Sequence, residues 1–373
     1  MTDHDRLSAD AATAAKKLAD VSRTGEPGRV NRPLVRALAG EGFPRRLLRR
    51  SRAGEDAPFS SVELCVVREA LARESTTVEN ALTIQLLGII PILLAGTDDQ
   101  VARFVDPVVH GDAVAAFALT EPDAGTDAGA LQLTARREPD GYRLTGTKAF
   151  ISNAPDADFY TLFARTAADA GSKGITAFLV DGKAKGMRGR PLQIVSDHPI
   201  GRLELEDVVV ADDRVLGEVN QGFRLAMRTL DLFRPSVGAN ALGMAQAALD
   251  ASIEHAAKRK AFGRPIKDFQ AVSHQLAEMA TRLEAARALV YEAAEAYDRG
   301  DAHVARYSAM AKLFATETAQ RVIDVSIQVH GAIALERGHL LEHLYREVRA
   351  PRIYEGTSEI QREIIARDLF KGR

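Results

Sequence analysis

The chain has a single cysteine, no tryptophan and no excess of charge of either sign. One cysteine, Cys65, excludes an intrachain disulfide framework and is typical of a protein from a reducing compartment. Because Cys65 lies in an apolar stretch, we expect an inert core residue rather than a nucleophile. The 49 basic and 51 acidic residues nearly balance, which argues against a protein held on nucleic acid mainly by phosphate contacts.

Targeting and membrane signals are also scarce. The first residues, Met-Thr-Asp-His-Asp, lack the basic and apolar regions of a signal peptide. The most apolar run, residues 81–95, contains Gln85 and Pro91 and looks too short to span a bilayer. We therefore expect a cytoplasmic protein that does not act in a membrane.

The residues that are abundant favour helices at both ends of the chain. Long segments rich in Ala, Leu, Glu and Arg predict helices, and 46% apolar residues allow a large core. In the middle, short apolar runs at 159–164, 175–180 and 203–210 predict strands. The expected fold class is α+β. Three domains are predicted: an N-terminal helical domain over residues 1–115, a middle β-domain over 116–218 and a C-terminal four-helix bundle over 219–373.

A loop near the C-terminus carries the strongest candidate for chemistry. Ser358 and Gln361 have the spacing of a capping box, which predicts that a helix begins there. Glu355 then lies one turn ahead of the helix, between Tyr354 and a flexible Gly356. Desolvation at this place would raise the pKa of Glu355 and suit it to act as a general base. A solvated glutamate in a helix-entry loop is the simpler alternative.

Residues 353–362, Ile-Tyr-Glu-Gly-Thr-Ser-Glu-Ile-Gln-Arg, resemble the C-terminal motif of the acyl-CoA dehydrogenases, a family of flavin-dependent enzymes. The resemblance implies that Glu355 is the catalytic base, which removes the α-proton of an acyl-CoA while the β-hydride passes to N5 of FAD. The product would be the trans-2-enoyl-CoA. The same motif implies that Tyr354 and Gly356 border the substrate and that Thr357 and Glu359 border the cofactor.

Residues 118–129, Ala-Leu-Thr-Glu-Pro-Asp-Ala-Gly-Thr-Asp-Ala-Gly, resemble the first signature of this family. Small residues in such a loop let backbone N–H groups approach the polar atoms of a ligand. The resemblance implies that Leu119, Thr120 and Thr126 contact FAD, and that Thr126 also borders the acyl-CoA.

A third stretch, residues 146–153, resembles the segment in which the family packs an aromatic ring on the flavin and bonds a hydroxyl group to N5. The corresponding residues here are Phe150 and Ser152. Many members have Trp and Thr at these positions, so the chain departs from the pattern but preserves the chemical types.

A fourth stretch contains Asp231 and Arg234, which resemble residues that contact the CoA portion or the mouth of the family's active site. Without the resemblance, the two would be an ordinary ion pair on a solvated helix face. In the isovaleryl and long-chain enzymes the base stands just before this Arg. Phe233 occupies that position here and cannot abstract a proton, so the resemblance leaves Glu355 as the base.

Two further stretches resemble segments that reach the FAD of a neighbouring subunit. The family usually has Gly-Gly where this chain has Gly331 and Ala332, whose methyl group narrows the space beside the cofactor. The resemblance therefore implies a homotetramer or a dimer with shared FAD sites. The implied cofactor-binding residues are Arg259, Phe262, Gln270, Gln328, His330, Gly331 and Ala332.

The resemblance also implies an electron-transfer flavoprotein as electron acceptor, and it leaves two alternatives open. One is a dehydrogenase or oxidase of an acyl group on a carrier protein, and the other is a catalytically silent flavin-binding subunit. In the first alternative an acidic carrier would meet a basic cluster. That cluster comprises Arg45, Arg46, Arg49, Arg50 and Arg52.

One competing motif points to a different chemistry. The segment from His339 to His343 fits the H-x-x-E-H pattern of some zinc peptidases. A zinc site needs a third protein ligand and a shaped cleft, and the segment lies inside the stretch that resembles the flavin enzymes. We therefore expect no metal.

Overall fold

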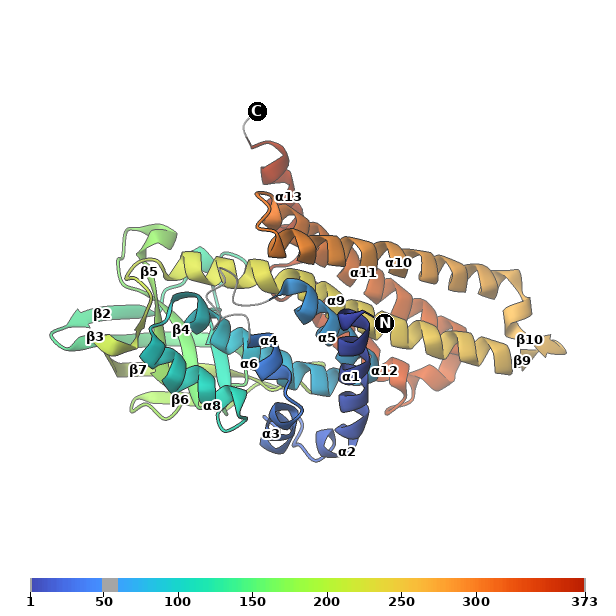
Figure 1. Cartoon of the computed structure of the whole chain (residues 1–373), viewed down its shortest axis with the longest axis horizontal. Coiled ribbons are helices and arrows are strands. Elements are labelled where there is room, and N and C mark those ends of the chain that lie inside the picture. The colour runs from blue at the N-terminus through green and yellow to red at the C-terminus, as the bar shows by residue number, and fades with distance from the viewer. Residues whose placement is uncertain (1, 49–59, 372–373) are drawn as a thin grey trace. The chain divides into compact units, whose positions relative to one another are not determined.

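The structure is a computed structural model that describes residues 2–48 and 60–371 (Figure 1). The α+β fold class is confirmed, because helices occupy both ends of the chain and a β-sheet occupies its middle. The chain forms two compact units. The helical unit combines Met1–Lys16, Ser60–Glu79 and Asp231–Arg373, and the sheet unit combines Lys17–Phe59 and Asn80–Leu230. The division into three domains stays a prediction.

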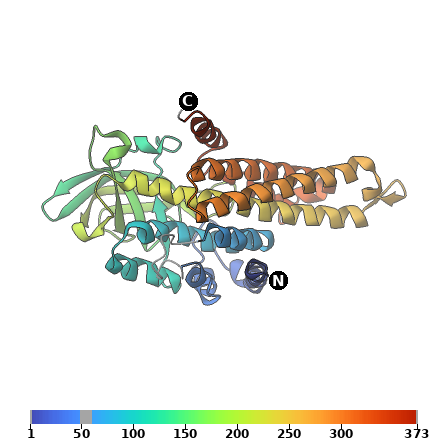
Figure 2. The same ribbon diagram turned by 45° about the horizontal axis from the view of Figure 1, so that its top comes forward.

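Long helices make up most of the helical unit. They are α1 (Asp3–Lys17), α5 (Ser61–Glu74), most of α9 (Gly222–Lys258), α10 (Gln270–Asp298), α11 (Val304–His330), α12 (Leu340–Val348) and α13 (Ser358–Leu369). Helices α9, α10 and α11 run side by side in Figures 1 and 2. Met279, Leu283, Ala286 and Val290 are buried on α10, on one helical face as their spacing predicts. Gly238 lets α9 approach α10 closely, because a Cβ atom at this position would lie only 2.8 Å from Val290 Cγ2 on α10.

A short hairpin joins α9 to α10. Its strands are β9 (Lys260–Ala261) and β10 (Arg264–Pro265), which pair antiparallel. Phe262 and Gly263 form the turn with positive φ angles of 51° and 80°. Two consecutive left-handed residues are typical of a tight hairpin turn, but a phenylalanine in this conformation is strained.

The sheet unit is built on one mixed sheet, whose strand order is β6-β7-β3-β2-β4-β5-β8, with β1 beside β4. Its strands are β1 (Ala115–Ala118), β2 (Thr134–Glu138), β3 (Gly141–Ser152), β4 (Phe159–Arg165), β5 (Ile175–Asp181), β6 (Met187–Pro191), β7 (Ile200–Ala211) and β8 (Val215–Leu216). The strands predicted around 159–164, 175–180 and 203–210 are confirmed as β4, β5 and β7. The core contains buried apolar side chains such as Ile151 and Phe178.

The remaining helices belong mainly to the sheet unit. They are α2 (Ala19–Ser22), α3 (Arg32–Gly40), α4 (Phe43–Leu48), most of α6 (Thr76–Ala95), α7 (Asp98–Gln100) and α8 (Asp106–Val109). Helix α6 packs on the sheet through polar contacts as well as apolar ones. Gln85 Oε1 accepts a hydrogen bond from the amide of Ala115 at 2.8 Å, and the carbonyl of Gly88 accepts one from Thr161 Oγ1 at 2.8 Å.

Our expectation that the apolar run is too short to cross a membrane was wrong as to length. Helix α6 begins five residues before the run, and its 20 residues suffice by length and composition. However, 67% of its most apolar window is buried inside the protein, as in the core helix of a soluble protein. The length of the apolar run underestimated the length of the helix, because the polar residues before the run belong to the same helix.

The close contact between α6 and β1 predicts that a substitution of Gly88 destabilises the protein. In Gly88→Ala, the new Cβ atom would lie 2.6 Å from Ala115 Cβ and 2.9 Å from the amide nitrogen of Ala116. We expect the free energy of unfolding to fall by about 1–3 kcal/mol, because neither backbone can move away easily. The change in the unfolding midpoint in urea, measured by circular dichroism, tests this.

The matched control is Gly40→Ala at the exposed end of α3, where the new Cβ atom has no neighbour within 4 Å. We expect the control to be neutral or to stabilise by about 0.4–1 kcal/mol, because alanine restricts the unfolded chain. Equal midpoints for the two variants would contradict the close packing of α6 on β1.

Candidate active site

Two successive residues with left-handed backbone conformations form the loop before α13. Glu355 has φ 54° and Gly356 has φ 92°. Side chains from three helices hold the carbonyl groups of these two residues. Arg234 Nε and Gln361 Nε2 donate to the Glu355 carbonyl at 3.3 and 3.2 Å. Lys312 Nζ and Gln361 Nε2 donate to the Gly356 carbonyl at 2.6 and 2.9 Å. The hydrogen bonds offset the strain of the loop and fix the direction of the Glu355 side chain.

The predicted capping box at the start of α13 is wrong by one residue. Thr357 is the N-cap, with extended backbone angles, and its hydroxyl accepts from the amide of Ile360 at 3.4 Å. Ser358 is the first helical residue, and its hydroxyl donates to Glu317 at 2.6 Å. Gln361 does reach back, but to the two loop carbonyls described above. The capping role follows backbone angles, which spacing alone does not reveal.

The Glu355 carboxyl group lies in a partly buried, electrostatically unusual place. Its Oε2 atom is buried and has no hydrogen-bond partner. Desolvation raises the pKa of Glu355 above its ordinary value, and the positive charges of Arg68, Lys312 and Arg234 oppose this rise. A solvated glutamate would have neither property. A carboxylate with an unused oxygen atom and a raised pKa is suited to accept a proton from a ligand.

The predicted substrate-side residues Asp231, Arg234, Tyr354 and Gly356 gather around Glu355. Arg234 pairs with Asp231 at 2.6 Å and also donates to the Glu355 carbonyl, so this pair is not a solvated one. The Tyr354 hydroxyl accepts from Asn240 Nδ2 at 3.4 Å. The four predicted substrate-side residues therefore lie close to the Glu355 loop within the helical unit.

Two charged side chains near this loop escaped the sequence analysis. Arg68 is 3% exposed, pairs with Glu79 at 2.5 Å and donates to Ser236 Oγ at 2.8 Å. Lys312 has no exposed surface, and burial lowers its pKa to about 8. The available signal was limited to Lys312, a single charge within an apolar run of α11, because Arg68 in α5 stands directly before Glu69.

The sheet unit holds the second group of predicted residues, at the end of β3. A bulge between Lys148 and Ile151 shifts the register with β7 and places Phe150 at φ 55°. Phe150 is 59% exposed, although Ala149 and Ile151 on either side of it in β3 are buried. Two residues later, Ser152 Oγ lies 2.8 Å from Nε2 of His198. Ile151 between them is buried in the core, so Phe150 and Ser152 present their side chains away from it.

A buried ion pair fastens the signature loop to β3 beside this group. The Glu121 carboxylate accepts from Lys148 Nζ at 2.9 Å, and Lys148 also donates to the Leu119 carbonyl at 2.8 Å. The next residue, Ala149, donates its amide to the Thr120 carbonyl at 3.0 Å. Leu119 and Thr120 therefore lie next to the strand segment that carries Phe150. Thr126 is exposed farther along the loop.

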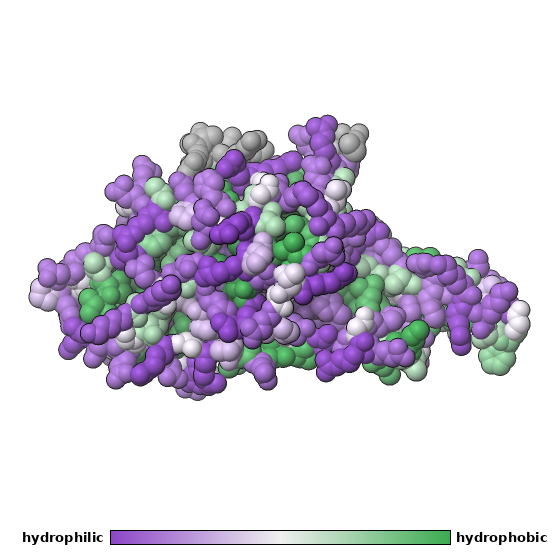
Figure 3. All heavy atoms as spheres, turned by 90° about the horizontal axis from the view of Figure 1, so that it is seen from below, coloured by the Kyte–Doolittle hydropathy of each residue, from purple (hydrophilic) through white to green (hydrophobic). Residues whose placement is uncertain are grey.

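The residues predicted to serve a neighbouring subunit are mostly exposed. Phe262 at the hairpin tip is 96% exposed, and Figure 3 shows white and green spheres at this tip, at the right-hand end as in Figure 1. His330 at the end of α11 stacks on His255 with ring centroids 4.2 Å apart. Thr357 caps α13, as described above. The other residues predicted to reach a neighbouring subunit are also exposed: Arg259, Gln270, Gln328, Gly331 and Ala332. Glu359, which the motif around Glu355 implies at the cofactor, is exposed too.

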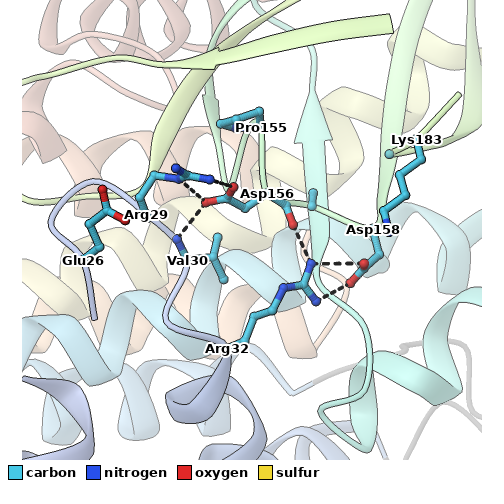
Figure 4. Close-up of a pocket in the computed structure, with 10 residues that line it drawn as sticks. Glu26, Arg29, Val30, Arg32, Pro155, Asp156, Asp158 and Lys183 are labelled. Atoms are coloured by element: carbon cyan, nitrogen blue, oxygen red, sulfur yellow. Dashed lines mark hydrogen bonds and ion pairs between the residues drawn. The ribbon is translucent and has the colours of Figure 1, made fainter. Parts of the chain in front are cut away.

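A surface hollow of about 450 Å³ lies elsewhere in the sheet unit (Figure 4). Arg29 forms an ion pair with Asp156, and Arg32 pairs with Asp158 at 2.8 Å. The amide of Val30 also donates to Asp156 at 3.1 Å. These contacts tie the start of α3 and the segment before it to the connection between β3 and β4, so we interpret the hollow as a structural junction.

Two other sequence features have limited structural support. In the basic cluster, Arg45 is exposed on α4 and Arg46 is half-buried, while Arg49, Arg50 and Arg52 lie outside the described residues. In the candidate zinc motif, His343 Nε2 lies 2.7 Å from Thr76 Oγ1, and Nδ1 of His339 accepts from an amide at 3.1 Å. These nitrogen atoms make contacts within the protein. Among residues 2–48 and 60–371, no group of three or more potential ligands could hold a metal ion.

Comparisons with known proteins match most of the chain. The family profile "Acyl-CoA dehydrogenase, middle domain" matches residues 116–208, and "Acyl-CoA dehydrogenase, C-terminal domain" matches residues 220–370. The 3-(aryl)acrylate reductase of Clostridium sporogenes is 45% identical over 75% of both chains. The caffeyl-CoA reductase-Etf complex subunit CarC of Acetobacterium woodii is 40% identical, again over 75% of both. The chain belongs to the acyl-CoA dehydrogenase family.

Solved structures agree with this assignment over the whole chain. Butyryl-CoA dehydrogenase from Megasphaera elsdenii superposes with a TM-score of 0.92 at 33% identity, covering 100% of this chain and 99% of the other. The FAD complex of PigA has a TM-score of 0.92 at 27% identity, covering 99% and 98%. The protein is therefore an oxidoreductase that uses a flavin and acts on acyl-CoA.

The hydrogen bonds of Gln361 predict how the enzyme responds to Gly356→Ala. The new Cβ atom would lie 2.6 Å from Gln361 Nε2, and φ 92° is strained for alanine. We expect about 1–2 kcal/mol of destabilisation from the left-handed backbone and about 1–3 kcal/mol more from the displaced amide. The unfolding midpoint in urea measures the sum.

Gly338→Ala is the matched control. Gly338 has φ 89°, but a Cβ atom there would have no neighbour within 4 Å, so this variant reports backbone strain alone. Equal losses in the two variants would mean that Gln361 does not hold the Glu355 loop.

Proposed function

We propose that the enzyme removes the α-proton of an acyl-CoA with Glu355 and forms the trans-2-enoyl-CoA. The observation that carries this proposal is the state of the carboxyl group. One of its oxygen atoms is buried without a partner, and desolvation raises its pKa. An α C–H group is a weak acid, so a base with a raised pKa and a fixed position reduces the barrier to proton transfer.

Stabilisation of the substrate carbonyl is the second requirement. Negative charge develops on the thioester oxygen as the α-proton leaves, and a positioned N–H group lowers the energy of that state. The amide of Glu355 makes no hydrogen bond within the described residues and is available for this role. Its direction is set by the same left-handed loop that orients the carboxylate.

The flavin is proposed to be FAD, held in part by the group at the end of β3. Phe150 would pack against its ring, and Ser152, Leu119, Thr120 and Thr126 would offer hydroxyl and backbone groups. The exposed aromatic ring and the hydroxyl two residues away fit a flat heteroaromatic ligand. When bound, FAD supplies the acceptor for the two electrons that leave the acyl chain. Glu355, on its own loop, handles the proton.

Reduction of an enoyl thioester is a second candidate, favoured by the two relatives that are named reductases. In that direction Glu355 would deliver a proton to the α-carbon instead of removing one. The buried carboxyl group suits both directions, because its raised pKa makes the protonated form more accessible than in a solvated glutamate. The direction then depends on the electron partner.

We propose an electron-transfer flavoprotein as that partner, since one relative is named as a subunit of an Etf complex. We also propose a cytoplasmic homotetramer or dimer. The exposed Phe262 and the exposed positions near the end of α11 would then complete the FAD site of a neighbouring subunit. A strained and almost fully exposed phenylalanine is consistent with a contact made only on assembly.

Glu355→Gln is the direct test of the proposed base. Glutamine keeps the shape of the side chain but cannot accept the proton, so we expect FAD to stay bound and turnover to fall by at least about 10³-fold. Anaerobic bleaching of the flavin absorbance by a panel of acyl-CoAs gives the rate. Glu363→Gln, on the exposed side of α13, is the matched control and should bleach normally. Near-wild-type turnover in Glu355→Gln would refute the assignment.

The positive charge of Lys312 should affect the pH dependence of turnover, because it lowers the pKa of Glu355. Glu355 works as a base only when deprotonated, so dehydrogenation falls as the pH drops through its raised pKa. Lys312 opposes that rise in pKa, so Lys312→Met should shift the acidic limb of kcat/KM to higher pH. Lys16→Met, at an exposed position on α1, should leave the profile unchanged. An acidic limb that stays in place or moves to lower pH would contradict the electrostatic description.

A further inference from the structure

The hydroxyl group of Ser152 has a specific partner inside the sheet unit. Its Oγ atom lies 2.8 Å from Nε2 of His198, in the connection between β6 and β7. We propose that His198 is a positioning residue, which orients the Ser152 hydroxyl toward the flavin. This inference rests on the proposed function, because it takes Ser152 to be the residue that contacts the cofactor.

The backbone around His198 is fixed to the end of β3. Ser152 pairs with Ile200 in the register of β3 and β7, and the Pro199 carbonyl accepts from the amide of Asn153 at 2.8 Å. Asn153 has φ 64°, and its side chain donates to the Ala115 carbonyl in β1 at 2.8 Å. The backbone that follows His198 is therefore fixed beside the residue that carries the hydroxyl. An ordinary loop side chain would lack these constraints.

Burial keeps this imidazole neutral at working pH. Desolvation lowers the pKa of His198 to about 4, so the ring carries one N–H group and one lone pair near pH 7. A neutral ring can donate to Ser152 Oγ or accept from it, depending on the tautomer. A charged ring could only donate, which would restrict the hydroxyl to a single role.

The two tautomers of His198 leave the Ser152 hydroxyl with different hydrogen-bonding groups for the cofactor. If His198 donates, the Ser152 hydrogen atom stays available for an acceptor on the cofactor. If His198 accepts, a lone pair of Ser152 stays available for a donor on the cofactor. Atom N5 of a flavin is an acceptor in the oxidised ring and carries a hydrogen atom in the reduced ring. The His198–Ser152 pair therefore offers a complementary group to both forms.

The alternative is a purely structural hydrogen bond that holds the connection before β7. The two hypotheses predict different effects of a His198 substitution in a protein that already lacks the Ser152 hydroxyl. A structural bond would cost stability but leave the redox properties of the flavin alone. A positioning role would change those properties through Ser152, and the effects of the two substitutions would not add.

The test compares His198→Phe, Ser152→Ala and the double variant in the FAD-loaded oligomer. Phenylalanine keeps the ring and its approximate volume but removes both nitrogen atoms. The readouts are the midpoint potential of the flavin, its visible spectrum and the rate of anaerobic bleaching by an acyl-CoA. His198→Gln places an amide near the position of Nε2 and serves as the rescue variant. His110→Phe, on an exposed histidine after α8, is the matched control.

We expect His198→Phe to slow bleaching by about tenfold, the effect of one hydrogen bond, and to shift the potential in the same direction as Ser152→Ala. The double variant should behave like Ser152→Ala alone, and His198→Gln should restore the wild-type potential. An unchanged potential in His198→Phe, or fully additive effects, would overturn the inference while leaving the proposed function intact. If His198→Phe does not fold, His198→Leu, which also lacks a hydrogen-bonding group, takes its place in the comparison with the same expected and overturning results. A wild-type protein whose bound FAD is reduced by no acyl-CoA, and whose reduced FAD is reoxidised by no enoyl-CoA, would instead refute the proposed function.

Discussion

The chemistry proposed for this enzyme depends on a short loop that side chains from three helices hold in place. Glu355 and Gly356 both adopt left-handed conformations, and such residues cost roughly 1–3 kcal/mol unless the surroundings enforce them. The enforcing donors, Arg234, Lys312 and Gln361, come from α9, α11 and α13. The helix bundle is therefore more than a scaffold. Its packing determines where one carboxylate oxygen and one amide group point.

Buried charges in both units serve placement rather than stability. A buried ion pair contributes little net stability, because desolvation of the two charges cancels much of their attraction. Arg68 and Glu79 nevertheless lie fully inside the helical unit, and Lys148 with Glu121 does the same in the sheet unit. Within the first pair, Arg68 counteracts the effect of desolvation on the pKa of Glu355, whereas Glu79 adds to the rise. The second fixes the loop that carries Leu119 and Thr120 next to β3.

The sequence was most informative where a pattern is local. Short apolar runs located β4, β5 and β7, helical spacing located the buried face of α10, and the motif around Glu355 indicated the family. It was less informative where a contact joins distant segments. The cap fell on Thr357 instead of Ser358, because capping follows backbone angles. His198 stands alone in a polar connection, and its partner, 46 positions earlier, becomes visible only once β3 and β7 pair.

The buried thiol in α5 has a practical consequence. Cys65 has no exposed surface, and burial raises the pKa of its sulfhydryl group, so little thiolate forms at neutral pH. No other cysteine exists in the chain. We therefore expect the native thiol of the folded protein not to react with maleimides. A cysteine introduced at any exposed position would be the sole site of labelling, and pairs of fluorophores could report distances in solution without prior removal of a native thiol.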